Sequence, residues 1–419
     1  ISAFATLSLT SGGFAVAMKD YSNKRDEYES SILTLTSIVA VAIALIYIIA
    51  PGFWQKVIGL SNSLIVLMLI GFLVAPARDF WLSRQRFEYK YKLAGFISIF
   101  TAFLASVISV FVVIYMSNHN IQSTAIGRLF ANYLIVYGVA GVIWFYIFLK
   151  GKTFYCKEYW KMSLAISVPL IGYNIAGQIL NVSDRMMISS MVNNSAVGIY
   201  GTLYTVSSLS LLVWQAINSS FVPYLFQNID KEKHDIKKVS NLLLEAYAII
   251  SILMTFFAPE IVKILATKEY YDAIYIMPSI AAGVFFTSYA NLYSNIAVYY
   301  KKTKYVMYPA IIAAGINLIL NYIFIKMFGY MAAAYTTLFS YIVLAFLQAI
   351  WSKKVCIEND NDINSIYDNK KLFILAILTT LISLCAISLY SNIYLRYLCI
   401  VIGLVVVLFM GRRIAQIKR

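Results

Sequence analysis

The chain has little of the chemistry on which disulfide scaffolds and metalloenzymes depend. Its 419 residues include only 4 cysteines and 2 histidines. That is too few for a disulfide framework or for a site with several thiolate or imidazole ligands. The histidines, His119 and His234, lie far apart, and neither has a partner at metal-ligand spacing. We therefore expect free thiols, no metal and no cofactor.

Charge is also scarce, since charged residues make up 13% of the chain whereas hydrophobic residues make up 61%. This balance excludes both a typical soluble domain and a disordered chain. The net charge of +15 could suggest nucleic acid as a partner. A basic groove on a soluble fold would not need so many apolar residues, so we expect no nucleic-acid partner.

Motifs for catalysis are missing as well. Gly151-Lys152-Thr153 has the end of a phosphate-binding loop, but Tyr146 stands where the first glycine of that loop belongs. There is no H-E-x-x-H and no G-x-S-x-G sequence. The sequence therefore predicts that the protein is not an enzyme.

What the chain does have is a series of apolar runs long enough to cross a bilayer as helices. We predict an all-α polytopic membrane protein with thirteen spans, separated by short polar clusters. These spans are 1–18, 30–50, 61–77, 93–115, 127–149, 163–191, 197–221, 242–258, 276–298, 306–325, 330–350, 372–390 and 395–411.

Lysine and arginine are distributed unevenly between the loops on the two sides of these spans. Alternate loops and the C-terminal tail hold 27 of the 34 cations, the opposite loops hold 6, and Arg185 lies within a span. Because basic loops stay in the cytoplasm, we expect the richer side, including the C-terminus, to be cytoplasmic. The longest polar stretch, 351–371, lies on that side.

An internal repeat runs through the chain. Pro51 and Pro259 each follow an alanine at the outer end of a span, and the basic loops at Tyr91 and Tyr300 keep nearly the same offset of 208–209 residues. This predicts two pseudo-symmetric six-helix bundles, 1–149 and 150–350, followed by a cytoplasmic loop and two extra helices in 351–419. The offset also predicts that roughly 50 residues precede Ile1 in the intact chain, giving fourteen spans.

Polar side chains inside the spans are candidate functional residues, because such groups are costly in lipid. Asn174, Gln178, Asn181 and Arg185 share one helical face. Interhelical hydrogen bonding is the alternative role of each amide. Further polar residues lie in later spans, with Tyr200 beside them. The candidates there are Tyr204, Gln215, Asn291, Asn295, Asn317 and Asn321.

Asp184 and Arg185 are adjacent charges within one span. A charged pair inside a membrane is rarer than a polar residue that joins helices, which favours a functional role. The structural alternative is a mutually neutralising pair that locks the outer end of the bundle.

The stretch Arg78–Lys92, RDFWLSRQRFEYKYK, mixes aromatic residues with cations. We expect it to lie in the membrane interface and to contact anionic lipid head groups. Its alternative role is to set topology only.

Two segments resemble those of bacterial polysaccharide flippases of the multidrug/oligosaccharidyl-lipid/polysaccharide exporter superfamily. They are NVSDRMMISSMVNNSAVGIY, from Asn181 to Tyr200, and GINLILNYIFIKMFGYMAAAYT, from Gly315 to Thr336. The second segment has Gly-Tyr-Met-Ala-Ala-Ala where the family more often has glycines. Together with the helix order and the repeat, the resemblance covers nearly the whole chain.

The resemblance implies translocation of an undecaprenyl-pyrophosphate-linked oligosaccharide, an O-antigen or capsule repeat unit, across the bacterial cytoplasmic membrane. Transport would use alternating access driven by an ion gradient, with polysaccharide polymerase machinery as a partner. Arg185 would bind the pyrophosphate or acidic sugars, the amide and tyrosine candidates would bind substrate, and Asp184 would serve ion coupling or hold Arg185. The alternative function is a multidrug or small-cation antiporter of the same superfamily, although 30–50, 61–77, 93–115 and 127–149 contain no acidic residue.

Overall fold

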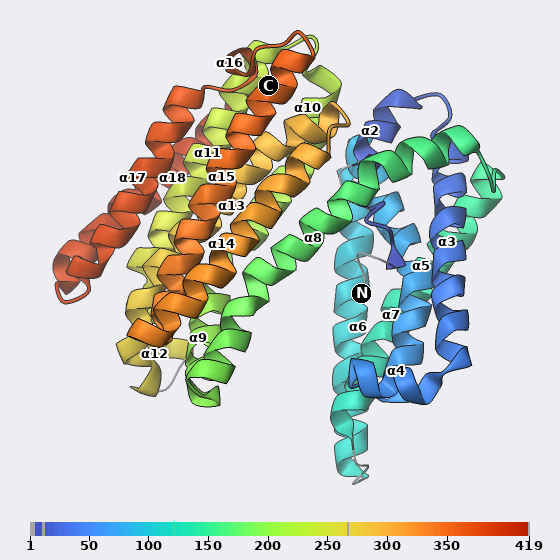
Figure 1. Ribbon diagram of the computed structural model, residues 1–419, viewed down its shortest axis with the longest axis horizontal. Helices are drawn as coiled ribbons and strands as arrows, with labels where there is room; N and C mark the ends of the chain where they lie inside the picture. The colour runs from blue at the N-terminus through green and yellow to red at the C-terminus, as the bar shows by residue number, and fades with distance from the viewer. Residues whose placement is uncertain (1–4, 11–12, 120, 122, 266–267, 418–419) are drawn as a thin grey trace. The chain divides into compact units, whose positions relative to one another are not determined.

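A computed structural model of the chain describes residues 5–10, 13–119, 121, 123–265 and 268–417 (Figure 1). All regular secondary structure in these ranges is helical. Twelve stretches are long and apolar enough to span a membrane, so the chain is an all-α, multi-pass membrane protein. The helices that make these spans are α3 Arg25–Ile49, α5 Asn62–Phe87, α6 Tyr91–Asn118, α7 Thr124–Gly151, α8 Lys157–Met191, α9 Asn194–Ser207 with α10 Ser210–Asn228, α11 Lys233–Phe256, α13 Met277–Tyr299, α14 Lys304–Phe328, α15 Ala332–Glu358, α17 Asn369–Cys385 and α18 Ile393–Ile417.

Short helices join several of these spans. They are α2 Gly13–Asp20, α4 Pro51–Ile58, α12 Ala258–Leu265, α16 Ile363–Ile366 and the 3₁₀ helices η1 Lys268–Ile276 and η2 Ala386–Leu389.

The first expected span, 1–18, differs from the structure. Within it Ala5 is helical and residues 6–10 form turns, and Leu7 and Ser8 have left-handed φ angles of 49° and 50°. The described helix that follows is α2, which is eight residues long. The parts of the expected span at 1–4 and 11–12 lie outside the described residues.

The expected span 197–221 is a pair of helices rather than one. At the junction the Leu209 amide bonds the Val206 carbonyl at 3.2 Å, and the Leu211 amide bonds the Ser208 carbonyl at 2.9 Å. These i→i+3 bonds interrupt the α-helical period between α9 and α10. Side chains before and after the junction therefore do not continue one face.

The chain divides into two compact units, residues 1–171 and 172–419, and α8 is a single helix that belongs to both. Its first half packs into unit 1, where Trp160 donates to the Ser31 carbonyl at 3.1 Å and Tyr28 and Ser163 share a 2.7 Å hydrogen bond. The structural division therefore falls within α8, whereas the sequence boundary at 149/150 placed all of α8 in the second bundle.

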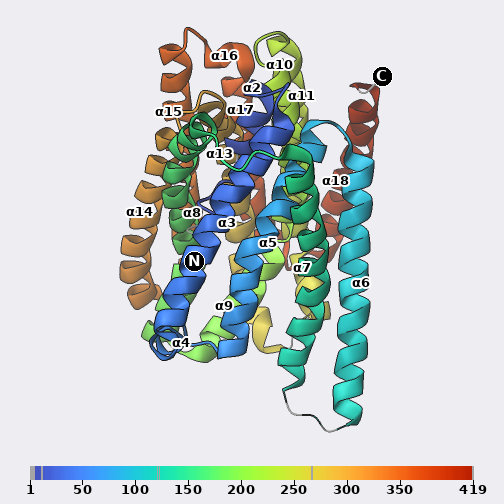
Figure 2. The same cartoon turned by 90° about the vertical axis from the view of Figure 1, so that its right-hand side faces the viewer.

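Helix order and packing repeat from one unit to the other. In unit 1, α3 packs on α5 and α7, and both α5 and α6 pack on α7 (Figure 2). In unit 2, α11 packs on α13, and both α13 and α14 pack on α15. The turns that follow α5 and α13 also match, since Tyr89 and Lys301 adopt left-handed φ angles of 57° and 60°. In each turn the next amide, of Lys90 or Lys302, bonds a carbonyl five residues back at 2.8 Å.

The two extra helices α17 and α18 are integral to unit 2 and pack on α11. At the N-terminal end of α17, Tyr293 donates to Asn369 at 2.5 Å and Tyr367 donates to the Leu292 carbonyl at 3.0 Å. Near the start of α18, Arg396 pairs with Glu260 at 2.5 Å. The stretch 351–371 is thus docked on the helices rather than extended away from them.

In unit 1, charged side chains form a cluster at the ends of α3, α5 and α7. Arg84 pairs with Asp26, with Glu29 at 2.8 Å and with Glu88 at 2.9 Å, and Lys150 contacts Asp26 at 3.2 Å. Glu29 is 2% exposed. The sequence did not single out this buried carboxylate, because the expected span began at residue 30, whereas α3 begins at Arg25.

The cluster includes part of the stretch Arg78–Lys92, whose contact with lipid head groups stays a prediction. Residues up to Phe87 continue α5, and Phe80, Trp81, Leu82 and Phe87 are buried in unit 1. Arg84 binds three carboxylates of this chain. Buried aromatic side chains on this part of the helix explain why it packs inward.

Candidate functional site

Asp184 lies on the half of α8 that belongs to unit 2 and is completely buried. Its Oδ2 accepts a 2.5 Å hydrogen bond from the Tyr200 hydroxyl, and its Oδ1 accepts from the amide of Arg185 at 2.8 Å. No ion pair involves Asp184 within the part of the chain that the structure describes. A buried carboxylate without a cationic partner is costly when ionised.

The guanidinium of Arg185 does not form an ion pair with Asp184. Its guanidinium lies over the Tyr204 ring, with 4.7 Å between Cζ and the ring centre, and its side chain also lies near Gly201. The Nε atom is buried and has no hydrogen-bond partner. Successive residues on a helix diverge by about 100°, which explains why adjacent charges do not pair. The arginine therefore keeps donors for another acceptor.

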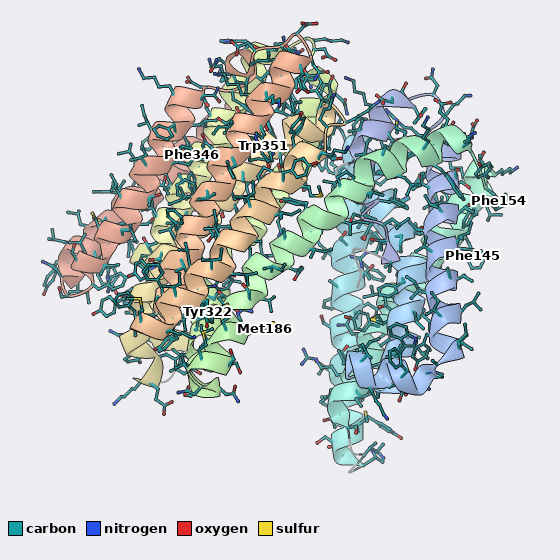
Figure 3. The ribbon with its side chains drawn as sticks, in the orientation of Figure 1. Phe145, Phe154, Met186, Tyr322, Phe346 and Trp351 are labelled. Atoms are coloured by element: carbon teal, nitrogen blue, oxygen red, sulfur yellow. The ribbon has the colours of Figure 1, made fainter. Side chains whose placement is uncertain are left out.

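Asn181, Tyr204 and Tyr341 form a polar group beside Arg185. Asn181 Oδ1 accepts from the Tyr204 hydroxyl at 3.0 Å and from the Tyr341 hydroxyl at 3.2 Å. Asn181 itself is exposed, whereas both tyrosines are buried. The arrangement fixes the asparagine amide next to the cation, on the same stretch of α8 as the exposed Met186 (Figure 3).

Asn317 and Asn321 lie in a buried network between α8, α14 and α15. Asn317 accepts from Ser183 at 3.1 Å and from Asn321 at 3.1 Å, and donates to Thr337 at 3.2 Å. Thr336 donates to Asn321. Both asparagines are 0% exposed. In this structure both asparagines therefore join neighbouring helices, and a role in substrate binding stays a prediction.

The remaining predicted residues fall into two groups. Asn291 accepts from Tyr173 at 3.2 Å, and Asn295 donates to Asn218 at 2.9 Å. These two link helices across unit 2. Gln178 and Gln215 are exposed and Asn174 is half-buried. Gln215 lies on α10, beyond the junction at 207–210, so it does not continue the face of Tyr204.

Sequence reasoning missed Tyr341, Ser183, Thr336 and Thr337 as members of these networks. Tyrosine is abundant in the chain, with 33 copies, so Tyr341 does not stand out. Serine and threonine often bond to carbonyls of their own helix. A usable signal was Ser183 beside Asp184, since two successive polar residues within a span are unusual.

Comparison with known proteins agrees with this fold. Residues 169–323 match the family model described as MatE. This matched stretch lies in the middle of the chain. It holds the α8 half with Asp184 and Arg185, and it extends through Asn321 on α14. MatE proteins are transporters rather than enzymes.

Solved structures extend the likeness to most of the chain. A mutant of the Vibrio cholerae MATE transporter VcmN superposes with a TM-score of 0.65, at 12% identity over 85% of each chain. A superfamily transporter from Pyrococcus furiosus, whose binding pocket is described as having reverse polarity, gives a TM-score of 0.63 at 13% identity over 84% of each chain. The chain therefore has the MATE fold.

One curated protein shows sequence similarity. The "Probable low-salt glycan biosynthesis flippase Agl15" of Haloferax volcanii is 28% identical over 183 residues. The aligned stretch is 42% of this chain and 38% of that protein.

Proposed function

We propose that the protein is a flippase for a lipid-linked oligosaccharide, with a pyrophosphate-bearing polyprenol as the lipid and a bacterial cytoplasmic membrane as its location. Transport by alternating access would carry the sugar from the cytoplasmic to the outer leaflet. The observation that carries the proposal is Arg185, an intramembrane cation that no carboxylate of the described chain neutralises.

The chemistry around Arg185 suits an anionic sugar conjugate. A guanidinium binds phosphate oxygens through several parallel N–H donors, and the Tyr204 ring below it holds the plane in place. The Asn181 amide beside it can bond sugar hydroxyl groups, which act as both donors and acceptors. Gln178, one turn away and exposed, extends the same polar stripe.

A carrier of organic cations would call for the opposite arrangement. Such a site needs an accessible carboxylate, but Asp184 is buried and receives the Tyr200 hydroxyl. The exposed side of this part of α8 instead presents an arginine and amides. This polarity favours an anionic substrate over a drug cation.

Asp184 is the proposed coupling residue. Asp184 accepts from Tyr200, and its neighbour Ser183 donates to Asn317, which in turn donates to Thr337. Such oxygen donors suit Na⁺ or a proton. Binding of Na⁺ or a proton to Asp184 would neutralise the carboxylate and change its hydrogen bond to Tyr200 on α9. The same helix carries Tyr204, whose ring lies under Arg185.

The Haloferax relative supports the proposal because its name describes a glycan flippase. The competing function is the multidrug or small-cation antiporter considered from the sequence, and the likeness to a structure described as a multidrug resistance MATE family transporter supports it. The two differ in the charge of what is transported, so one assay separates them.

The experiment uses the full chain reconstituted in vesicles, with a fluorescent oligosaccharide on polyprenyl diphosphate and, separately, a lipophilic cation. We expect translocation of the first substrate only. Arg185→Ala should reduce its rate roughly tenfold to a hundredfold, because one charge-assisted contact is lost. Arg185→Lys should retain part of it. Lys326→Ala is the matched control, since Lys326 also rests on a tyrosine ring, 3.9 Å from the centre of Tyr322. Cation export that is unaffected by Arg185→Ala would overturn the proposal in favour of antiport.

A further inference from the structure

Two lysines from different helices meet at one groove of unit 1. Lys90 ends the short turn between α5 and α6, and Lys150 lies in the last turn of α7. Both line a cavity of about 430 Å³. Their side chains are 62% and 45% exposed, so both ammonium groups reach solvent at the same place.

The corresponding helix ends of unit 2 carry one positive and one negative side chain instead of two lysines. In unit 2, Lys302 follows the left-handed residue of the turn after α13, as Lys90 does in the turn after α5, and Glu358 lies in the last turn of α15, as Lys150 does in α7. Lys302 and Glu358 form an ion pair at 3.8 Å. Unit 1 replaces that opposite-charge pair by two lysines, which repel each other unless an anion lies between them.

The neighbouring carboxylates do not occupy all the hydrogen-bond donors of Lys90 and Lys150. Lys90 contacts Glu88 at 2.7 Å and Lys150 contacts Asp26 at 3.2 Å. Both carboxylates are also bound by Arg84, and Glu88 additionally lies 3.5 Å from Arg25. An ammonium group has three donors, so each lysine retains donors for a further acceptor.

The floor of the groove is apolar and faces outward. Leu93 on α6 and Val142 and Tyr146 on α7 line it, and they are 50%, 71% and 48% exposed. On a membrane protein such side chains contact acyl chains. Cations above an apolar groove at the end of membrane helices are the arrangement that binds anionic lipid head groups.

We propose that the groove between α5, α6 and α7 binds an anionic phospholipid of the adjacent leaflet. Its phosphate would lie between Lys90 and Lys150, and one acyl chain would run along Leu93 and Val142. The site would fix the ends of three helices of unit 1 to the membrane surface. This proposal does not depend on what the protein transports.

The test is lipid binding to the purified full chain in detergent, with phosphatidylglycerol as probe and phosphatidylcholine for comparison. We expect native mass spectrometry to show phosphatidylglycerol retained in preference. The double substitution Lys90→Gln with Lys150→Gln should weaken that binding roughly tenfold or more. Lys302→Gln with Lys304→Gln, which removes two lysines at the corresponding turn of unit 2, should leave it unchanged.

Three outcomes would overturn the proposal. They are equal retention of the two lipids, unchanged binding in the Lys90/Lys150 variant, and displacement of phosphatidylglycerol by an equal amount of undecaprenyl phosphate, which would assign the groove to substrate. Millimolar inorganic phosphate should not compete, because it lacks the acyl chain. Lys90→Gln alone should show a partial effect, which keeps the test decisive if the double variant is unstable.

Discussion

Asp184 takes its hydrogen bond from Tyr200 at 2.5 Å, sixteen residues away, and not from the guanidinium of its neighbour Arg185. The two charges of the candidate site therefore have separate surroundings. The carboxylate belongs to the contact between α8 and α9, and the arginine belongs to the exposed polar stripe of α8.

Removing the Tyr200 hydroxyl tests the first of these surroundings. Tyr200→Phe should destabilise the protein by about 1–3 kcal/mol, because a buried carboxylate oxygen loses its donor. Thermal unfolding in detergent would measure the change. Tyr335→Phe is the control, since Tyr335 is exposed and its hydroxyl makes only a 3.5 Å contact with the Tyr275 carbonyl. Equal melting temperatures for the two variants would contradict the role of Tyr200.

Asn317 and Gln178 should separate structure from binding. Asn317→Ala should lower stability by about 1–3 kcal/mol, since Ser183, Asn321 and Thr337 all lose a buried partner. Gln178→Ala should leave the melting temperature unchanged and weaken substrate binding in vesicles. Loss of binding affinity in Asn317→Ala protein of normal stability would assign Asn317 to the substrate instead.

Two glycines of α7 give a matched pair. A Cβ at Gly151 would lie 2.2 Å from the Asp26 carbonyl oxygen and 2.3 Å from Ser30 Cβ, whereas a Cβ at Gly138 would meet nothing within 4 Å. Gly151→Ala should therefore cost about 1–3 kcal/mol as α7 moves away from α3. Gly138→Ala should be neutral or stabilise by up to about 1 kcal/mol. Unfolding of both variants by guanidinium or heat measures these changes in stability. If Gly151→Ala left stability unchanged, the ends of α3 and α7 would not be tightly packed.

Glu88 makes stability depend on pH in a defined window. Burial alone would raise the pKa of its carboxyl, but hydrogen bonds from Lys90 and Arg84 outweigh burial and hold this pKa at about 2. Because the pKa is lower in the folded protein than the usual 4.5, the stabilisation is complete above about pH 4.5 and is lost as the pH falls towards about 2. The melting temperature of Glu88→Gln should lie below that of the natural chain near neutral pH, and the gap should close on acidification. A constant gap at all pH values would contradict this assignment.

Much of the fold follows from hydropathy and the repeat alone. The expected spans 93–115 and 306–325 match both ends of α6 and α14 within a few residues, and 242–258 matches the C-terminal end of α11. The offset of 208–209 residues agrees with the spacing between the starts of α3 and α11. Bilayer thickness imposes a minimum length on every span, which makes such runs easy to recognise. The turns at Leu7 and Ser8 carry no glycine or proline, so the chain gives no local sign of them.

The candidate site was predictable only residue by residue. The helical period correctly put Asn181 and Arg185 on one face, because both lie on the uninterrupted α8. It could not predict that Tyr341 would meet Asn181, since that contact depends on how α15 packs. Gln215 was grouped with Tyr204 because Ser207–Ser210 contains no residue that marks a break in a helix.

Contacts at the start of α17 and near the start of α18 attach these helices to unit 2, and this has a consequence for shortened chains. Two contacts hold this hairpin on unit 2, between Arg396 and Glu260 and between Asn369 and Tyr293. The candidate membrane span that contains α13 is 83% buried. A chain that stops before residue 369 would present that central helix to lipid and leave the partly buried Glu260 carboxylate uncompensated. We therefore expect such a shortened chain to be less stable than the full chain and to be cleaved faster by a protease in detergent.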